Sequence, residues 1–370
     1  MKATRRLHDL GQSLWLDNIN RDLLASGALQ RYIDELSVTG LTSNPTIFNQ
    51  AVKTTAAYDA AIGDRAAPGR SDEDLFFDLA LADITRAADL FAPVHRRTCG
   101  VDGWVSLEVS PLLAYDTATT IAAARALHER AGRRNVLIKI PGTREGLPAI
   151  EEATFAGIPV NVTLLFSRQH YLAAAGAYLH GIERRIAAGL DPDVGSVASL
   201  FVSRWDVAVK HHVPPALANT LGIAIAQRCY KAYCDFIASP RYRRVLNAGA
   251  RPQRLLFAST GTKDPQAPDV LYVNALAAPL TVNTMPEATL KAFADHGEVG
   301  AILPADGGDC EAVIAAHERA GIDVAALASR LQEEGANAFV ASWNELLRVI
   351  GAKRAALAQE RESLSARDRG

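Results

Sequence analysis

Short apolar runs rich in β-branched residues alternate with longer stretches of helical period along most of the chain. This alternation is typical of parallel sheets whose strands are joined by helices. We predict eight strands, over residues 14–19, 38–43, 103–109, 135–140, 160–165, 196–202, 255–259 and 280–284. We predict helices between most of them, including 75–92, 118–131, 168–188 and 219–238. Eight strands in regular alternation with helices favour an α/β fold, a single (β/α)8 TIM barrel.

The alternative within the α/β class is a doubly wound open sheet. That fold binds dinucleotides at a Gly-x-Gly-x-x-Gly turn after its first strand, and the chain has no such turn there. No Pro/Gly/Ser-rich linker divides the 370 residues, so we expect one barrel domain over residues 1–370, with additional N- and C-terminal helices. The stretch from Ala336 has helical composition, and its highly charged end, residues 360–370, is expected to fray.

The composition is that of an ordinary soluble protein, with 49% hydrophobic residues, 22% charged residues and a formal net charge of −2. Such a near-neutral balance argues against a nucleic-acid surface. No apolar run is long enough to cross a bilayer and the N-terminal residues lack an apolar signal segment, so we expect no membrane partner and a cytoplasmic location. A monomer and a homodimer are both compatible with these features.

The cysteines lack metal-site spacing and are expected to be reduced and mostly buried, at positions 99, 229, 234 and 310.

One charged residue, Lys139, interrupts the apolar run at residues 135–141. A strand of this composition is typically buried on both faces, where desolvation favours a neutral amine over an ammonium ion. A neutral buried amine can attack a carbonyl carbon and form a Schiff base. A lysine that extends its ammonium group to solvent at the strand end is the alternative.

Further polar residues fall near the C-terminal ends of predicted strands. Side chains of a barrel strand alternate between the interior and the outer face, and catalytic residues lie at the C-terminal strand ends. Reading each strand with a period of two, we predict one shared pocket at the barrel mouth, formed by Asp17, Asn44, Glu108, Lys139, Asn161 and Thr163. A structural ion pair between Lys139 and Glu108 is the alternative to a catalytic site.

These side chains suit Schiff-base chemistry. Attack by Lys139 gives a carbinolamine, and its loss of water needs a proton that Glu108 can supply through a water molecule held by Thr163. Cleavage of a carbon–carbon bond beta to the iminium needs a base on the departing hydroxyl, for which Asp17 is the candidate.

We expect neither a metal nor an organic cofactor, because the iminium itself accepts the electron pair. His211 and His212 form an isolated pair and do not suggest a metal site. The amide groups of Asn44 and Asn161 can both donate to and accept from substrate hydroxyls.

Two later segments carry groups suited to an anion. Ser199 and Arg204 fall at the end of the predicted strand 196–202, and Ser259 and Lys263 fall at the end of the next one. Barrel phosphate sites often lie in the loops after late strands. The Gly-Thr-Lys sequence at 261–263 lacks the order of a P-loop, so we reject a nucleotide site. Surface salt bridges of Arg204 and Lys263 are the alternative.

The order of these residues resembles that of the transaldolase family. The segment Gly-Leu-Thr-Ser-Asn-Pro-Thr-Ile-Phe at 40–48 is similar to the first signature of that family. The segment Val-Leu-Ile-Lys-Ile-Pro-Gly-Thr at 136–143, continuing through Glu-Gly-Leu at 145–147, is similar to the second. Residues 106–109 and 161–167 match two further stretches. The resemblance covers residues 14–283, and the length resembles that of the longer bacterial-type transaldolases.

The resemblance implies a cofactor-free transferase of the pentose phosphate pathway with sugar phosphates as its small-molecule partners. Such an enzyme moves a dihydroxyacetone unit from sedoheptulose 7-phosphate to glyceraldehyde 3-phosphate, which gives erythrose 4-phosphate and fructose 6-phosphate. The resemblance makes Lys139 the Schiff-base nucleophile, places the catalytic water at Glu108 and Thr163, and makes Asp17 the acid/base. The implied sugar and phosphate contacts are Asn44, Asn161, Ser199, Arg204 and Ser259.

The chain departs from the family pattern in two places. Gly261 stands where the shorter transaldolases have an arginine, two residues after the position of Ser259, and Lys263 is our substitute for it. Residues 199–204 read Ser-Leu-Phe-Val-Ser-Arg where Ser-Pro-Phe-Val-Gly-Arg is usual.

Two other functions remain open. A fructose 6-phosphate aldolase-like lyase would use the same lysine, but those enzymes carry a tyrosine where this chain has Phe201. Phe201, which we place among the substrate-binding residues, cannot donate a proton to a bound carbanion and therefore favours transfer. A catalytically silent sugar-phosphate-binding barrel would be expected to lack Lys139, Glu108 or Asp17, and all three are present.

Overall fold

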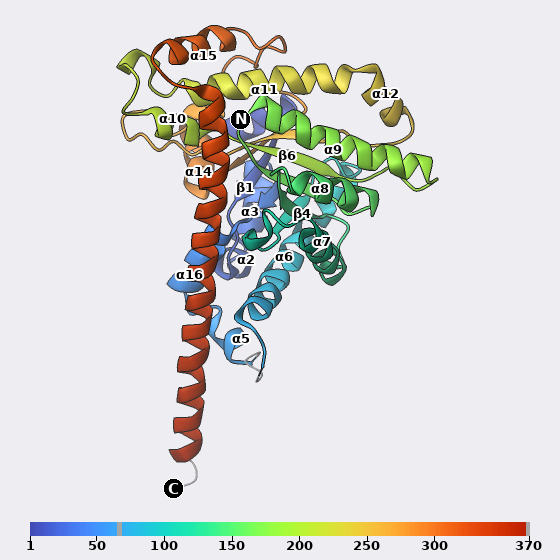
Figure 1. Cartoon of the computed structure of the whole chain (residues 1–370). Coiled ribbons are helices and arrows are strands. Elements are labelled where there is room, and N and C mark those ends of the chain that lie inside the picture. The colour runs from blue at the N-terminus through green and yellow to red at the C-terminus, as the bar shows by residue number, and fades with distance from the viewer. Residues whose placement is uncertain (65–68, 368–370) are drawn as a thin grey trace.

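The computed structural model describes residues 1–64 and 69–367, with side chains described through residue 360, and it confirms the predicted fold class. Eight strands form a closed barrel in chain order, and every neighbouring pair is parallel, including β8 with β1 (Figure 1). The strands are β1 (Ser13–Asp17), β2 (Val38–Thr42), β3 (Trp104–Glu108), β4 (Val136–Pro141), β5 (Val160–Leu165), β6 (Ser196–Phe201), β7 (Arg254–Ala258) and β8 (Val282–Met285).

Helices surround the barrel and cover its outer face (Figure 1). The α-helices are α1 (Ala3–Asp9), α2 (Arg21–Ala25), α3 (Ala28–Leu36), α4 (Pro45–Thr54), α5 (Asp59–Asp64), α6 (Asp72–Arg97), α7 (Thr117–Ala131), α8 (Gly146–Phe155), α9 (Arg168–Ala187), α10 (Ser203–Val209), α11 (Leu221–Ala238), α12 (Pro240–Asn247), α13 (Leu271–Ala275), α14 (Glu287–His296), α15 (Cys310–Arg319) and α16 (Val324–Arg367). Two short 3-10 helices are η1 (Pro111–Leu113) and η2 (Pro215–Leu217).

Two of the differences between predicted and observed element bounds lie next to strands of the barrel. The predicted strand at 280–284 begins too early, because Leu280 is 62% exposed with a left-handed φ of 60° and β8 starts only at Val282. The predicted helix at 75–92 ends too early, because α6 continues through Pro93 to Arg97. A proline inside a helix removes one backbone donor and crowds the carbonyl group four residues earlier. The helix nevertheless continues, and its last turn packs His95 against Trp104 at 4.7 Å between ring centroids.

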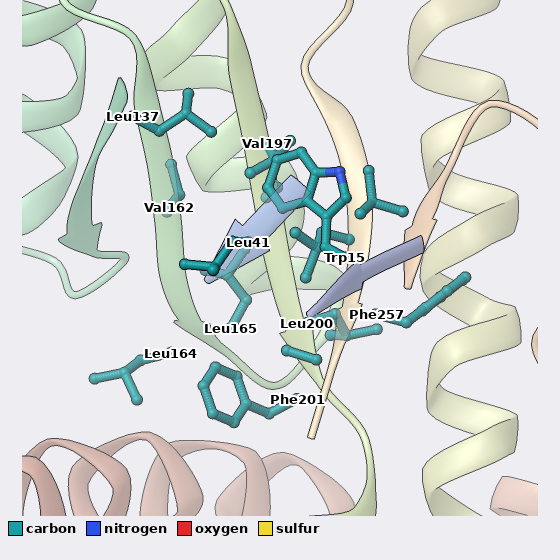
Figure 2. Close-up of a cluster of buried hydrophobic side chains, with 14 of the residues drawn as sticks. Trp15, Leu41, Leu137, Val162, Leu164, Leu165, Val197, Leu200, Phe201 and Phe257 are labelled. Carbon is teal, nitrogen blue, oxygen red and sulfur yellow. The ribbon is translucent and has the colours of Figure 1, made fainter. Parts of the chain in front are cut away.

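The barrel interior is filled with side chains from all around the sheet. Trp15 lies in it, fully buried and in register with Gly40 on the neighbouring strand. A Cβ atom at position 40 would lie 2.5 Å from the indole ring, so only glycine fits opposite this tryptophan. Figure 2 shows the apolar cluster that contains Trp15, with Leu137, Val197 and Leu200 among its members.

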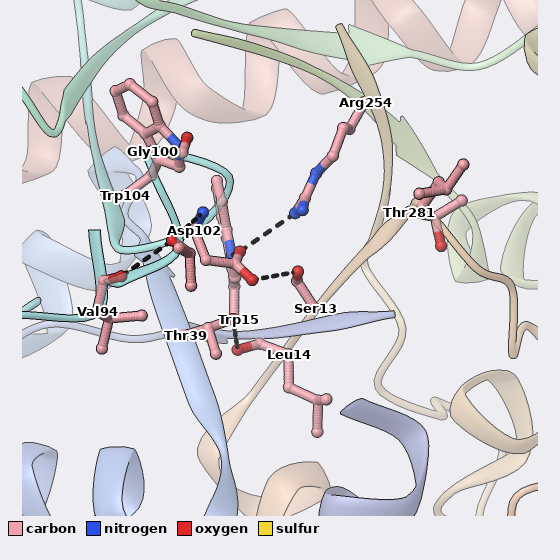
Figure 3. Close-up of polar contacts among 12 residues, drawn as sticks. Ser13, Leu14, Trp15, Thr39, Val94, Gly100, Asp102, Trp104, Arg254 and Thr281 are labelled. Carbon is pink, nitrogen blue, oxygen red and sulfur yellow. Dashed lines mark hydrogen bonds and ion pairs between the residues drawn. The ribbon is translucent and has the colours of Figure 1, made fainter. Parts of the chain in front are cut away.

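A buried ion pair lies at the N-terminal end of the barrel. Arg254 Nη2, at the start of β7, lies 3.3 Å from Asp102 Oδ1, just before β3. The same carboxylate accepts hydrogen bonds from Ser13 Oγ at 2.6 Å and Trp15 Nε1 at 3.3 Å (Figure 3). Both oxygen atoms of Asp102 therefore have partners, as a buried charge requires.

The C-terminal helix α16 is longer than expected. It begins at Val324 rather than Ala336 and packs against α4, α5, α6 and η1 and touches β5, while its last part projects beyond the rest of the fold (Figure 1). The expected frayed tail over residues 360–370 stays a prediction: α16 runs through Arg367, and residues 368–370 lie outside the described residues.

The structure bears on two further expectations, that the cysteines are reduced and mostly buried and that no segment crosses a membrane. All four cysteines are free thiols; Cys229 and Cys310 are buried and Cys234 is half-buried, but Cys99 is exposed, contrary to expectation, because it follows the end of α6 on the surface. Within the described residues, no helix combines the length and the apolar character needed to span a membrane.

Candidate active site

Lys139 is the centre of a polar site at the C-terminal end of the barrel. It lies on β4 in register with Glu108 on β3 and Asn161 on β5, and it is 4% exposed. Its Nζ atom lies 3.2 Å from Glu108 Oε2 and donates a hydrogen bond of 3.2 Å to the carbonyl oxygen of Ser43. The amine is thus held inside the barrel, and it does not extend to solvent.

The polar atoms around Lys139 are incompletely paired. Glu108 is 5% exposed, and although Oε2 forms the ion pair by distance, neither carboxylate oxygen has a partner with the geometry of a hydrogen bond. The hydroxyl of Thr163, fully buried on β5, also lacks a partner. Burial raises the pKa of the Glu108 carboxyl, and the nearby Lys139 charge opposes that shift. Buried polar atoms without partners are costly, so this arrangement favours a functional role over a structural one.

Asp17 stands on the pocket wall at the end of β1. Its Oδ1 accepts a hydrogen bond of 2.8 Å from Thr42 Oγ1, and that hydroxyl lies 2.7 Å from Thr284 Oγ1. Burial raises the pKa of the Asp17 carboxyl, while the Lys139 charge and the Thr42 hydrogen bond lower it. A carboxyl group with a raised pKa can exchange protons with a substrate nearer to neutral pH.

The two predicted amide residues occupy different positions. Asn44 lines the pocket and caps the N-terminus of α4 by accepting a hydrogen bond of 3.0 Å from Ile47 N. Asn161 is fully buried behind the pocket wall, where its Nδ2 donates to Ser106 Oγ at 3.0 Å and its Oδ1 accepts from Ser199 Oγ at 2.7 Å. Asn161 therefore orients the pocket-lining Ser199, while its second amide hydrogen and the second lone pair of Oδ1 are not used by these two bonds.

An unpaired guanidinium lies beside Lys139. Arg204 Cζ lies 5.0 Å from the ring centroid of Phe201 and 5.8 Å from that of Phe339, and no acid or carbonyl oxygen of the described residues pairs with it. Burial lowers the pKa of Arg204, opposed by the negative charges of Glu108 and Asp17. A guanidinium with free donors in a pocket has the charge and the geometry to bind an anion such as phosphate.

Ser259 and Lys263 follow β7, but only Ser259 lines the pocket. Ser259 has a left-handed φ of 56°, and its hydroxyl lies 2.9 Å from Ser203 Oγ. Strained backbone of this kind is common at ligand sites. Lys263 is exposed, near enough for its charge to lower the pKa of Asp17. At Gly261 a Cβ atom would lie 3.1 Å from Pro286 Cγ, which leaves little room for the arginine of the family pattern.

Four residues that line the pocket were missed by sequence reasoning: Thr42, Ala258, Thr284 and Phe339. The first three lie on strands and follow the same alternation that identified the acids. Phe339 comes from α16, and the sequence pattern that could have indicated its place in the pocket is weaker. Residues 331, 335, 339, 343, 346 and 350 form one buried stripe of the helix, which marks a face packed on the fold without saying which part of the fold.

The pocket as a whole is a small cavity, with an empty volume of about 460 Å³, at the barrel mouth. Active sites of (β/α)8 barrels lie at this end. The structure brings together Asp17, Asn44, Lys139, Thr163, Ser199, Phe201, Arg204 and Ser259 on its wall, with Glu108 directly behind Lys139. Within the described residues, no group of three or more His, Cys, Asp or Glu side chains could hold a metal ion.

Comparison with known proteins identifies relatives along almost the whole chain. Residues 14–350 match the family described as Transaldolase/Fructose-6-phosphate aldolase. A protein named Transaldolase from Thermobifida fusca (strain YX) is 46% identical over 352 residues, which cover 93% of this chain and 96% of the relative. One of the same name from Arthrobacter sp. (strain FB24) is 44% identical over 353 residues, covering 93% and 95%. The chain therefore belongs to the transaldolase/fructose-6-phosphate aldolase family.

Proposed function

We propose that this chain is a transaldolase of the non-oxidative pentose phosphate pathway. It transfers a dihydroxyacetone unit from sedoheptulose 7-phosphate to glyceraldehyde 3-phosphate and yields erythrose 4-phosphate and fructose 6-phosphate. Family membership and relatives named Transaldolase at 42–46% identity support this reaction. The observation that carries the proposal is the buried Lys139 amine beside an acid without hydrogen-bond partners, in a pocket that also presents a free guanidinium.

The reaction begins with covalent capture of the donor. Lys139 Nζ attacks the keto carbon of sedoheptulose 7-phosphate and forms a carbinolamine. Glu108, a carboxyl whose pKa is raised by burial, supplies the proton with which the carbinolamine hydroxyl leaves as water. The free hydroxyl of Thr163 holds the water molecule that carries this proton. The product is an iminium ion on Lys139.

Bond cleavage follows on the opposite side of the pocket. Asp17 removes the proton from the hydroxyl beta to the iminium, the carbon–carbon bond breaks, and its electron pair enters the iminium to give a three-carbon enamine. Asn44 and Ser199 bind the hydroxyls of the three-carbon unit, and Asn161 holds Ser199 in place. Arg204, with Ser259 and Lys263 near it, binds the phosphate. Attack of the enamine on the acceptor aldehyde and hydrolysis of the new iminium complete the transfer.

The setting of the enzyme is also part of the proposal. The partners are small sugar phosphates, the chain acts as a monomer or a homodimer, and the location is the cytoplasm. Size-exclusion chromatography with light scattering on the full chain distinguishes a monomer from a dimer.

Borohydride trapping tests the proposed mechanism directly. The protein is incubated with fructose 6-phosphate and reduced with borohydride, and the adduct is mapped by peptide mass spectrometry. We expect a three-carbon adduct on Lys139. A folded protein that forms no adduct at Lys139 would contradict the mechanism and favour the catalytically silent sugar-phosphate-binding barrel.

A fructose 6-phosphate aldolase-like activity is the second candidate, because the family description includes that enzyme. The position of Phe201 favours transfer: its ring lines the pocket beside Arg204 and has no proton to give to the enamine. Substituting Phe201→Tyr should raise aldol cleavage without acceptor relative to transfer. An unchanged ratio of the two rates would show that Phe201 does not control this choice.

A further inference from the structure

The helix α16 crosses the barrel mouth and is fixed on both sides of the pocket. On one side, Gln332 Nε2 donates hydrogen bonds to the carbonyl oxygens of Gly142 at 3.1 Å and Leu164 at 2.9 Å. On the other, the Trp343 ring packs against Phe76 and Phe77, with centroids 4.9 and 5.5 Å away. These two anchors are eleven residues apart, so the helix face between them is held over the pocket.

Phe339 lies between these anchors and projects into the site. Its side chain is 4% exposed, and its ring centroid lies 5.6 Å from Lys139 Nζ and 5.8 Å from Arg204 Cζ. Gly335, one turn earlier, lets the helix approach: a Cβ atom there would lie 3.0 Å from Leu164 Cδ2 and 3.1 Å from Arg204 Nη1. A glycine in a helix interior costs stability of about 1 kcal/mol, and close approach is a physical reason to keep it.

The aromatic wall around the amine has no proton donor. Arg204 Cζ lies 5.0 Å from the Phe201 ring centroid and 5.8 Å from that of Phe339. Phe166 packs against Phe201 at 5.3 Å between ring centroids. Figure 2 shows Phe201 at the edge of the apolar cluster, near Leu164, which contacts α16. The side of the amine that faces α16 is therefore covered by hydrocarbon.

We infer that Phe339 determines the fate of the three-carbon intermediate by keeping water from the enamine on Lys139. This inference rests on the proposed transfer reaction. The enamine has two possible fates. It can attack the aldehyde of an acceptor sugar, which forms a carbon–carbon bond and leads to transfer. Alternatively, its carbon takes a proton from water, the resulting iminium adds hydroxide, the carbon–nitrogen bond breaks, and dihydroxyacetone and the free Lys139 amine are released.

Both fates end in the hydrolysis of an iminium, but only the second needs water as a proton source at the enamine carbon. The Phe339 ring restricts the space through which water reaches that carbon. The ring also faces Lys139 Nζ and the Arg204 guanidinium with its π-electrons and adds no proton donor to the site. A smaller side chain at position 339 removes the cover but leaves the strand residues of the site in place. Such a variant should release dihydroxyacetone more often per transfer event.

The test compares two rates in Phe339→Leu and in the native chain. Release is the formation of glyceraldehyde 3-phosphate from fructose 6-phosphate alone, and transfer is the formation of sedoheptulose 7-phosphate when erythrose 4-phosphate is added. We expect the ratio of release to transfer to rise about tenfold, equivalent to about 1.4 kcal/mol between the two barriers. Phe339→Met, whose side chain has about the volume of leucine but is more flexible, should give a rise of similar size and serves if the leucine variant does not fold.

Trp343→Leu is the matched control, because Trp343 anchors the same helix one turn later and does not line the pocket. It should lower the unfolding temperature and leave the ratio unchanged. An unchanged ratio in both Phe339 variants, or an equal rise in Trp343→Leu, would overturn the inference. Borohydride trapping on the native chain distinguishes the two possible failures. If only the inference about Phe339 is wrong, an adduct still forms on Lys139; if the proposed function is wrong, no adduct forms there.

Discussion

The two ends of the barrel each bury one ion pair, and the pairs differ in how well they are satisfied. At the N-terminal end, Asp102 has hydrogen-bond partners for both oxygens and pairs with Arg254 (Figure 3). At the C-terminal end, Glu108 lies 3.2 Å from Lys139, but its oxygens have no partner with hydrogen-bond geometry. Both carboxylates are 5% exposed, so burial alone does not separate them.

The difference shows how a structural charge pair can be told from a reactive one. A satisfied buried pair recovers its desolvation cost through hydrogen bonds and holds neighbouring strands together. An unsatisfied pair keeps its cost, and its free lone pairs and donors remain available to a substrate. We therefore expect substitutions in the Asp102–Arg254 pair, at the N-terminal end of the barrel, to affect stability. Substitutions around Lys139, at the C-terminal end, should affect catalysis.

The largest expected effect is the loss of activity in Lys139→Met. Removing the nucleophile should lower kcat by a factor of about 10⁴ or more, as removal of a covalent catalyst does in other enzymes. The unfolding free energy should change by only about 1 kcal/mol, because methionine is similar in length to lysine and Glu108 can take up a proton when the Lys139 charge is removed. Steady-state kinetics and urea unfolding measure both quantities. A Lys139→Met variant that loses several kcal/mol of unfolding free energy, or that retains much of the native kcat, would contradict the contrast between the two ends of the barrel.

The reverse pattern is expected for Asp102→Asn. The substitution keeps the shape of the side chain but leaves the buried Arg254 charge without its partner, which should lower the unfolding free energy by about 3–5 kcal/mol. The folded fraction should keep the native kcat/KM. A strong loss of activity with unchanged stability would mean that the hydrogen-bond network of Asp102 influences the Lys139 site and is not purely structural.

The phosphate site should show a smaller and substrate-specific effect. Arg204→Met should raise KM for phosphorylated acceptors by the equivalent of about 1–3 kcal/mol, the range for a charge-assisted hydrogen bond. Lys263→Met should act in the same direction but more weakly, because Lys263 is exposed. Unphosphorylated glyceraldehyde is the control acceptor. An equal loss with that substrate would show that these residues do not bind the phosphate.

The smallest expected effect is a pH dependence of stability from Asp17. Burial raises its folded-state pKa above the ordinary value near 3.8, so the folded protein binds more protons than the unfolded chain between the two values. This contribution makes stability fall as pH rises through that window. Asp17→Asn removes it, and urea unfolding at several pH values should give the variant a less negative slope. An identical slope in both proteins would mean that the carboxyl is not perturbed.

Much of the fold and most of the site positions could be predicted from sequence, since both depend on local periodicity. The alternation of apolar runs predicted eight strands, and a period of two on β1, β3, β4 and β5 placed Asp17, Glu108, Lys139 and Thr163 inside the barrel. Strand ends were less predictable. Leu280 has the composition of a strand residue but a left-handed backbone, which only its loop position explains.

The hydrogen-bond partners of the site could not be predicted in this way. Asn161 has the same sequence features as a substrate-binding amide, but the barrel closes with both its polar atoms bonded to Ser106 and Ser199. Whether an inward-facing amide meets a neighbour or the cavity depends on the register of three strands, which no single segment encodes.

The barrel, the inward lysine and the family signatures follow from the sequence alone, because a strand's inward face and a short motif are both properties of consecutive residues. The contact of Phe339 with Lys139, two hundred positions earlier in the chain, and the pairing of Asp102 with Arg254 become visible only in the folded chain. Those contacts depend on where α16 crosses the barrel and on how the strands close around it. Packing of distant surfaces determines both, and an amphipathic stripe shows that a face is buried without naming its partner.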